Sequence, residues 1–115
     1  MTEADIYSLI GGLADGKVYP DIAPLNTAGE PAIAPPWVTF TLVSQVYGDT
    51  LSCLAEESST LQVDVYAVDV DEAREVREQV IAALTPLQFT QLSKTGGYEP
   101  ETGLRRATLE MQILQ

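Results

Sequence analysis

Side chains able to perform chemistry are sparse in this sequence, and they do not group into a catalytic pattern. Histidine is absent, which removes the usual general base and the commonest metal ligand. The single cysteine, Cys53, is followed closely by Glu56 and Glu57, and negative neighbours disfavour the thiolate that would act as a nucleophile. Neither a Ser-His nor a Cys-His pair can form. We therefore predict that the chain has no catalytic residues and is not an enzyme.

Carboxylates are numerous, so a pair of them is weak evidence of a site. Asp69 and Asp71 stand at a strand-to-helix junction, where the simplest role of Asp69 is a helix N-cap and that of Asp71 is a first-turn charge. No D-x-D-x-D-G calcium loop is present, and the two Gly-Gly pairs match neither phosphate-binding pattern. We expect no metal ion and no cofactor, which leaves the surfaces of the domain to carry its function.

The charge balance excludes further classes of function. The 115 residues carry a net charge of -11, with 17 acidic and 6 basic side chains. The basic residues are scattered along the sequence without interleaved aromatics, and the net field should repel a phosphate backbone. No apolar run approaches the ~20 residues that a membrane span needs. The acidic N-terminus does not resemble a signal peptide, and a lone cysteine fits a reducing compartment. The six basic residues are Lys17, Arg74, Arg77, Lys94, Arg105 and Arg106.

The elements are organised around residues 61–84. Alternate apolar residues in 61–67 predict a half-buried strand, and apolar residues at steps of three and four in 73–84 predict one face of a helix. Asp69 with Glu72 resembles a capping box, and Pro86 should end the helix. The polar residues of the helix, Arg77 among them, are expected on its outer face.

The remaining segments predict one more helix and three more strands. A first helix is expected over 2–13, a short extended piece at Val18 and Tyr19, and a long Pro-rich loop over 20–36. Strands are expected over 37–47, 87–94 and 104–114, with a turn-rich connection over 95–103. The order α-β-β-α-β-β predicts an α+β fold, in which an antiparallel sheet carries two helices on one face. The length suits a single domain over 1–115.

Four sequence segments together resemble a known family. They are VYP (18–20) before the Pro-rich loop, PPWVTF (35–40) entering a strand, LQVDVYAVDVDEAREVREQVIAAL (61–84), and ETGLRRATLEMQI (101–113) at the end. In this order and spacing they resemble the tail-completion proteins of long-tailed bacteriophages, a group that includes tail terminators and tail-to-head joining proteins. The resemblance covers nearly the whole chain.

The resemblance implies a structural virion protein without an active site. It implies a ring of six copies at the head-proximal end of the tail tube, assembled in the host cytoplasm, which stops tube growth and joins the tail to the head. The expected partners are other copies of the chain, the tail tube protein and a head-completion or connector protein, with genomic DNA passing through unbound. Two alternatives stay open: a head-side connector or stopper of the neck, and a small acidic protein-binding module.

Two sets of residues are predicted to form contacts. Residues 48–58 lack a hydrophobic period and are expected to form a loop or hairpin tip, on which apolar residues rimmed by acids suggest a partner contact. The polar positions of the last strand are candidates to face the lumen of a ring. The partner-contact residues are Leu51, Cys53 and Leu54, and the lumen-facing residues are Glu110 and Gln112.

Overall fold

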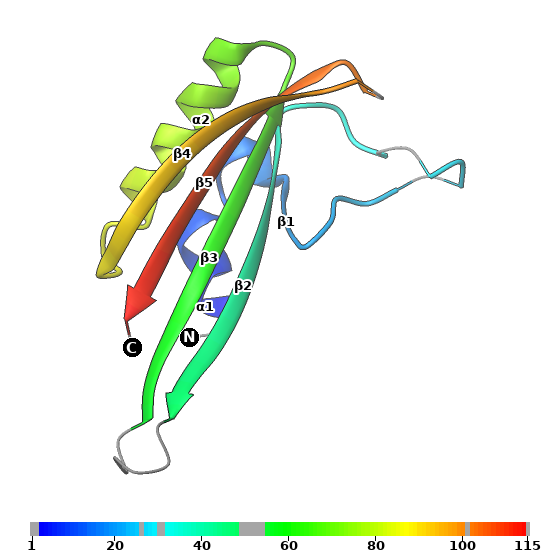
Figure 1. Cartoon of the computed structure of the whole chain (residues 1–115). Helices are drawn as coiled ribbons and strands as arrows, with labels where there is room; N and C mark the ends of the chain where they lie inside the picture. Colours follow the sequence, from blue (N-terminus) through cyan, green and yellow to red (C-terminus); the bar gives the residue numbers. More distant parts are fainter. Residues whose placement is uncertain (1–2, 26, 30–31, 49–54, 101, 115) are drawn as a thin grey trace.

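The chain folds into one sheet and two α-helices, seen here in a computed structural model (Figure 1). The structure describes residues 3–25, 27–29, 32–48, 55–100 and 102–114, and it describes only the backbone for 44–48, 55–58 and 114. The predicted α+β fold is confirmed. The elements in chain order are α1 (Glu3–Ile10), the 3-10 turn η1 (Ala14–Gly16), β1 (Val18–Pro20), β2 (Trp37–Gly48), β3 (Ala55–Ala67), α2 (Val70–Ala83), β4 (Phe89–Glu99) and β5 (Leu104–Leu114).

The sheet has five strands in the order β1-β2-β3-β5-β4. Two hairpins, β2-β3 and β4-β5, are joined through the antiparallel pairing of β3 with β5. The predicted order lacked β1, which lies parallel to β2 and makes the sheet mixed. A three-residue strand is too short to show a period of two, so only its pairing with residues 38–40 identifies it.

Both helices lie on the same side of the sheet (Figure 1). The predicted apolar stripe of α2 is buried: Val80 and Leu84 are fully covered and Ala73 is 1% exposed. Asp69 caps the helix as predicted, since its Oδ1 accepts a hydrogen bond of 2.7 Å from the backbone N–H of Glu72. The helix ends at Ala83, ahead of Pro86, as the sequence predicted.

The first helix is shorter than the predicted 2–13. It ends at Ile10, and the backbone N–H of Gly11 closes the last turn on the carbonyl of Tyr7 at 2.7 Å. Ala14 and Asp15 then adopt left-handed φ values of 50° and 56°, which a continuing α-helix does not allow. Burial of Ile6 and Ile10 still anchors α1 to the core.

The side of the sheet beneath the helices, called the covered face below, holds the main core. Along β5, the alternation predicted from the sequence is confirmed, because every second side chain from Ala107 to Ile113 is at most 2% exposed. The same period holds along β3 from residue 61 onward. The β-strand residues of the covered face are Val38, Phe40, Leu61, Val63, Val65, Ala67, Ala107, Leu109, Met111 and Ile113.

Two strand boundaries differ from the prediction. β3 begins at Ala55, inside the expected loop 48–58, and β4 continues to Glu99, inside the expected turn-rich connection 95–103. Residues 55–57 pair only with β2, since β5 joins β3 at Ser58. β4 is an edge strand whose register shifts between Thr90 and Ser93, and it is exposed along most of its length. β4 is not buried on one face, so it shows no apolar period.

The Pro-rich segment 21–36, called the arm below, contains no helix or strand among its described residues, as predicted for 20–36, except that Pro20 belongs to β1. Its two limbs are joined by a hydrogen bond of 2.8 Å from the N–H of Ala32 to the carbonyl of Pro24. At its base, Ala23 packs with Trp37 and Leu104 in a second small cluster. The described helices are all too short and too polar to cross a membrane.

Candidate assembly surfaces

The side of the sheet that carries no helix is called the open face below, and it is polar. The strand registers place side chains of like position in rows across β2, β3, β5 and β4. Threonine, serine and glutamine dominate these rows, and Asp64 and Glu110 supply their carboxylates. The rows are Thr41-Gln62-Glu110-Ser93 and Thr39-Asp64-Thr108-Thr95, followed by Val43-Thr60-Gln112-Thr90, in which Val43 is an exposed apolar member.

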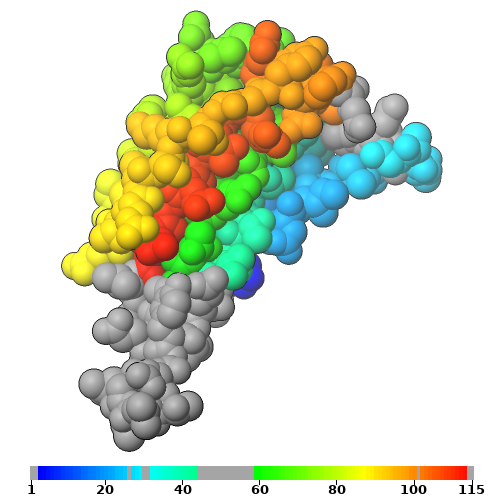
Figure 2. Space-filling model, viewed as in Figure 1, coloured from blue at the N-terminus to red at the C-terminus, as the bar shows by residue number. Residues whose placement is uncertain are grey.

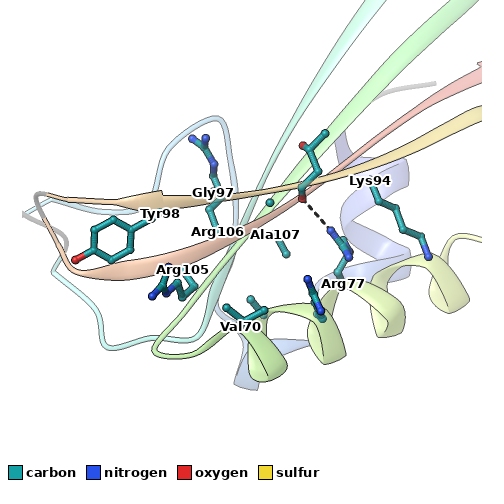
Figure 3. A pocket seen from close by; sticks show the side chains of 12 residues that line it. Val70, Arg77, Lys94, Gly97, Tyr98, Arg105, Arg106 and Ala107 are labelled. Atoms are coloured by element: carbon teal, nitrogen blue, oxygen red, sulfur yellow. Dashed lines mark hydrogen bonds between the residues drawn. The ribbon is translucent and has the colours of Figure 1, made fainter.

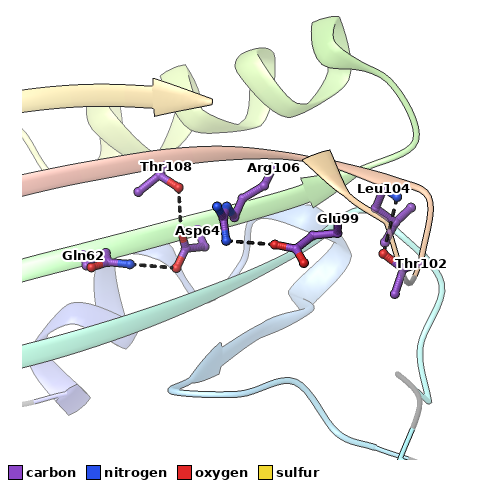
Figure 4. A network of polar contacts seen from close by, with 7 residues as sticks. All are labelled: Gln62, Asp64, Glu99, Thr102, Leu104, Arg106 and Thr108. Carbon is purple, nitrogen blue, oxygen red and sulfur yellow. Dashed lines mark hydrogen bonds and ion pairs between the residues drawn. The ribbon is translucent and has the colours of Figure 1, made fainter. Parts of the chain in front are cut away.

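Hydrogen bonds between side chains fix the middle of the open face (Figure 4). The hydroxyl of Thr108 donates to Asp64 Oδ1 at 2.6 Å, and the amide of Gln62 donates to Asp64 Oδ2 at 3.2 Å. The guanidinium of Arg106 forms an ion pair of 2.8 Å with Glu99. The carboxylates in this network therefore have defined partners, which holds the polar surface in one arrangement.

Beside this network the open face meets the base of the arm. Trp37 stacks on Tyr66 with ring centroids 5.3 Å apart, so Tyr66 packs on this face as an aromatic partner rather than standing in solvent. Burial raises the pKa of the Tyr66 hydroxyl, and the negative charge of Asp64 adds to the effect. Tyr66 is therefore a neutral hydrogen-bonding group at neutral pH.

Both residues predicted to face a lumen lie on the open face. Glu110 is exposed and Gln112 is half-buried. Their orientation in an assembly stays a prediction. Leu51, Cys53 and Leu54, the predicted partner contacts, fall outside the described residues. The strands on either side of them extend beyond β5 as a two-stranded ribbon, paired as far as Gly48 with Ala55 (Figure 1).

A second surface was not predicted. A groove of about 460 Å³ runs between α2 and the β4-β5 hairpin, and no acidic residue lines it (Figure 3). Five of the six basic residues line this groove, although they are scattered in the sequence. Arg106 turns its guanidinium to Glu99 on the open face, and the other four remain on the groove side. This basic groove is formed by Arg74, Arg77, Lys94 and Arg105, with Val70, Ala73, Tyr98 and Ala107 as apolar lining.

The four cations are held differently. Arg77 is 9% exposed and donates from Nη1 to the carbonyl of Thr95 at 2.9 Å, while its Nε has no hydrogen-bond partner. Lys94 forms an ion pair of 2.8 Å with Glu78, whose carboxyl pKa this hydrogen bond lowers. Arg105 stacks over the ring of Tyr98 at 4.7 Å. The exposed guanidinium of Arg74 has no ionic partner in the described part of the chain.

The position of Arg77 corrects the prediction that it lies on the outer face of α2. It follows Ala73 by four residues and precedes Val80 by three, so helical geometry places it within the buried stripe. This spacing indicated a buried position in the sequence, but the charge of Arg77 led to the prediction of an exposed one. A long side chain can cross an apolar layer and place its charged group at the edge.

Among the described residues, no three carboxylate or thiol groups are placed to share a metal ion. The described residues form four distinct surfaces: a polar open face, a basic groove, a projecting ribbon and an arm.

Comparisons with known proteins identify a similar fold and a matching family. A chain in the solved structure of the virion of a native gene transfer agent particle has a similar fold, with a TM-score of 0.58. The sequences are 16% identical, and the match covers 98% of this chain and 85% of that chain. No curated protein matches the sequence. The family model for the tail completion protein gp17 matches residues 1–115. The chain therefore belongs to the tail completion protein gp17 family, whose members are structural, non-enzymatic components of the virion tail.

Proposed function

We propose that this tail completion protein forms a closed ring at the head-proximal end of the tail tube. The ring ends tube growth and presents the surface to which the head joins. A ring of identical subunits needs a heterologous interface, in which two different patches of each subunit meet and rotation closes the circle. The single observation that carries the proposal is the open face, a whole side of a sheet that is polar, ordered and free of helices.

The open face suits the lining of a channel for DNA. Its rows are rich in threonine, serine and glutamine, Asp64 and Glu110 add negative charge, and its cation Arg106 is already paired with Glu99. Six copies of a chain with net charge -11 carry six times that charge, or -66. A lumen lined in this way repels the phosphate backbone, so the genome passes without adhering. Glu110 and Gln112 are the residues proposed to face that lumen.

The β2-β3 ribbon is the proposed contact with the tail tube. It extends past the edge of β5, where it is paired on neither outer side. Exposed strand edges can add to another sheet, and apolar side chains at a tip can dock between subunits. Leu51, Cys53 and Leu54 at its tip are the proposed docking residues.

Assembly is tested first. Light scattering over a range of concentrations, with and without purified tail tubes, should find a particle of six times the 12.4 kDa subunit mass or hexameric caps on tube ends. Tails made without the protein should be longer than normal and fail to join heads. A protein that stays monomeric and leaves tube ends bare would contradict the proposal.

Substitutions that change the charge of the open face test whether this face lines the lumen. Glu110→Arg with Gln112→Arg should leave the ring intact and create salt-sensitive duplex binding in a mobility-shift assay, where the wild type shows none. The matched control is Glu75→Arg with Gln79→Arg, two exposed positions on α2. If control and lumen variants bind duplex equally, the open face does not line the channel. Pull-down against tail tube and head-side connector proteins distinguishes a tube terminator from a neck component.

A further inference from the structure

The basic groove concentrates most of the positive charge of a chain that is otherwise acidic. With its four cations set aside, the rest of the chain carries 17 acidic side chains against two basic ones, Lys17 and Arg106. Arg74 has no ionic partner in the described part of the chain, and the buried Nε of Arg77 has no hydrogen-bond partner. A cluster of cations that lacks some of its ionic and hydrogen-bond partners is electrostatically complementary to an acidic partner.

We propose that the basic groove is the docking site for the arm of a second copy of this chain, so that neighbouring subunits join head to tail. This inference rests on the ring proposed above and names its two complementary patches. It assigns the groove to one subunit and residues 21–36 to the next.

The arm has the chemistry that the groove needs. Its sequence holds Asp21 and Glu30 and no lysine or arginine. Asp21 is exposed, and beside it Ile22 and Leu25 are 65% and 49% exposed. Large apolar side chains this open, on a segment whose base is anchored, are typical of a contact surface.

The groove also has exposed apolar side chains beside its cations, which could contact the apolar side chains of the arm. Val70 is 39% exposed at one end, and Tyr98 is 51% exposed near Arg105. An arm laid in the groove would place apolar side chains against Val70 and Tyr98 and its carboxylate near Arg74 or Arg105. Such a contact combines the burial of apolar side chains with ion pairs, and the ion pairs disfavour other positions of the arm in the groove.

The two patches lie on different faces of the sheet, because the base of the arm packs beside Trp37 and Tyr66 on the open face and the groove lies beneath α2. The arm follows β1, which is one edge of the sheet, and the groove lies beside β4, which is the other edge. In Figures 1 and 2 the arm extends to the right and α2 lies on the left, while the end of the β4-β5 hairpin lies above the arm. Two different, complementary patches on one subunit satisfy the requirement for a heterologous interface that repeats around a ring.

Net repulsion between like-charged copies does not prevent this contact. At physiological ionic strength charges are screened beyond about 8 Å, so the charges in contact decide the interaction. Duplex DNA is the competing occupant. It is disfavoured because the groove is lined by apolar side chains as well as cations, and because two of its cations are already engaged with Glu78 and Tyr98.

The test is a pair of charge-reversed proteins. The groove variant is Arg74→Glu with Arg105→Glu, which takes the net charge from -11 to -15. The arm variant is Asp21→Lys with Thr27→Lys, which takes it from -11 to -8. All four side chains are exposed, and circular dichroism with thermal melts checks that both proteins fold. Arg74→Lys with Arg105→Lys keeps the charge and serves as the control.

Each reversed variant alone should be monomeric, because groove and arm then carry the same sign. An equimolar mixture should assemble to the wild-type mass, with the two proteins alternating, because each groove meets an arm of opposite sign. The arm variant is less charged than the wild type, so its failure to assemble cannot come from net repulsion. The charge-conserving control should assemble alone.

Three results would overturn the inference. A wild type that never assembles, on or off tubes, would remove the proposed ring and this contact with it. Folded variants that each form normal rings would remove only the groove-arm contact. Duplex binding by the wild type that the groove variant loses, with rings unaffected, would assign the groove to phosphate.

Discussion

The covered face and the open face of the sheet are built from the same strands and differ in what they contribute. On β5, Leu109 and Met111 are fully buried beneath the helices, while Glu110 between them is exposed. Burial of apolar surface stabilises the fold by roughly 25 cal/mol for each Å² removed from water. The open face adds little to stability, so its residues are free to be selected for contacts. The alternation along each strand thus separates the side chains that stabilise the fold from those that remain available for contacts.

The largest effect should follow from a change on the covered face. Leu109→Ala should lower the free energy of unfolding by about 2–5 kcal/mol, because it removes buried methyl groups and leaves a cavity. Glu110→Ala, one residue away on the open face, is the matched control and should change it by less than about 0.5 kcal/mol. Urea denaturation measures both. Equal losses for the two variants would break the distinction between the faces.

A smaller effect is expected at the junction between α2 and β4. Arg77→Met keeps the length of the side chain but leaves the carbonyl of Thr95 without its 2.9 Å donor, so we expect a loss of about 1–3 kcal/mol. Arg74→Met, on the exposed side of the same helix, should be nearly neutral toward unfolding. Thermal melts compare the pair. If Arg77→Met is as stable as Arg74→Met, the Arg77 contact contributes no stability.

The smallest effect belongs to the polar network of the open face. Asp64→Ala removes the acceptor for Thr108 and Gln62 and should cost about 1 kcal/mol. Gln62→Ala removes only the longer, exposed bond and should cost less. Urea denaturation ranks them. A loss for Asp64→Ala as large as that for Leu109→Ala would show that the open face contributes to the core stability after all.

The sequence predicted best where one face of an element is buried. Residues 61–84 and 104–114 show their strand and helix periods because burial selects the residue at each position. The cap at Asp69 and the helix end before Pro86 are local chemistry, and both are confirmed. Strand β1 and the full length of β4 depend on pairing between segments and carry no such period.

The candidate sites also differ in whether they depend on one element or on contacts between elements. The side on which Glu110 and Gln112 lie follows from alternation along a single strand, so it could be predicted. The basic groove could not, because Arg74 and Arg105 are thirty-one residues apart in sequence and meet only when α2 packs beside β5. Arg77 had a usable signal in its spacing from Ala73 and Val80, which its charge concealed.

By itself, the sequence determined the fold class, the absence of a histidine-based active site, the strongly acidic balance and the membership in a tail completion family. The first three follow from composition and from periods shorter than one element, whereas the family follows from the order and spacing of segments that resemble it. The tertiary structure alone decided which charges share a surface, which edges of the sheet oppose each other and where the arm lies relative to the groove. Those relations depend on long-range packing and strand pairing, in which residues far apart in the chain are brought together by the burial of the covered face.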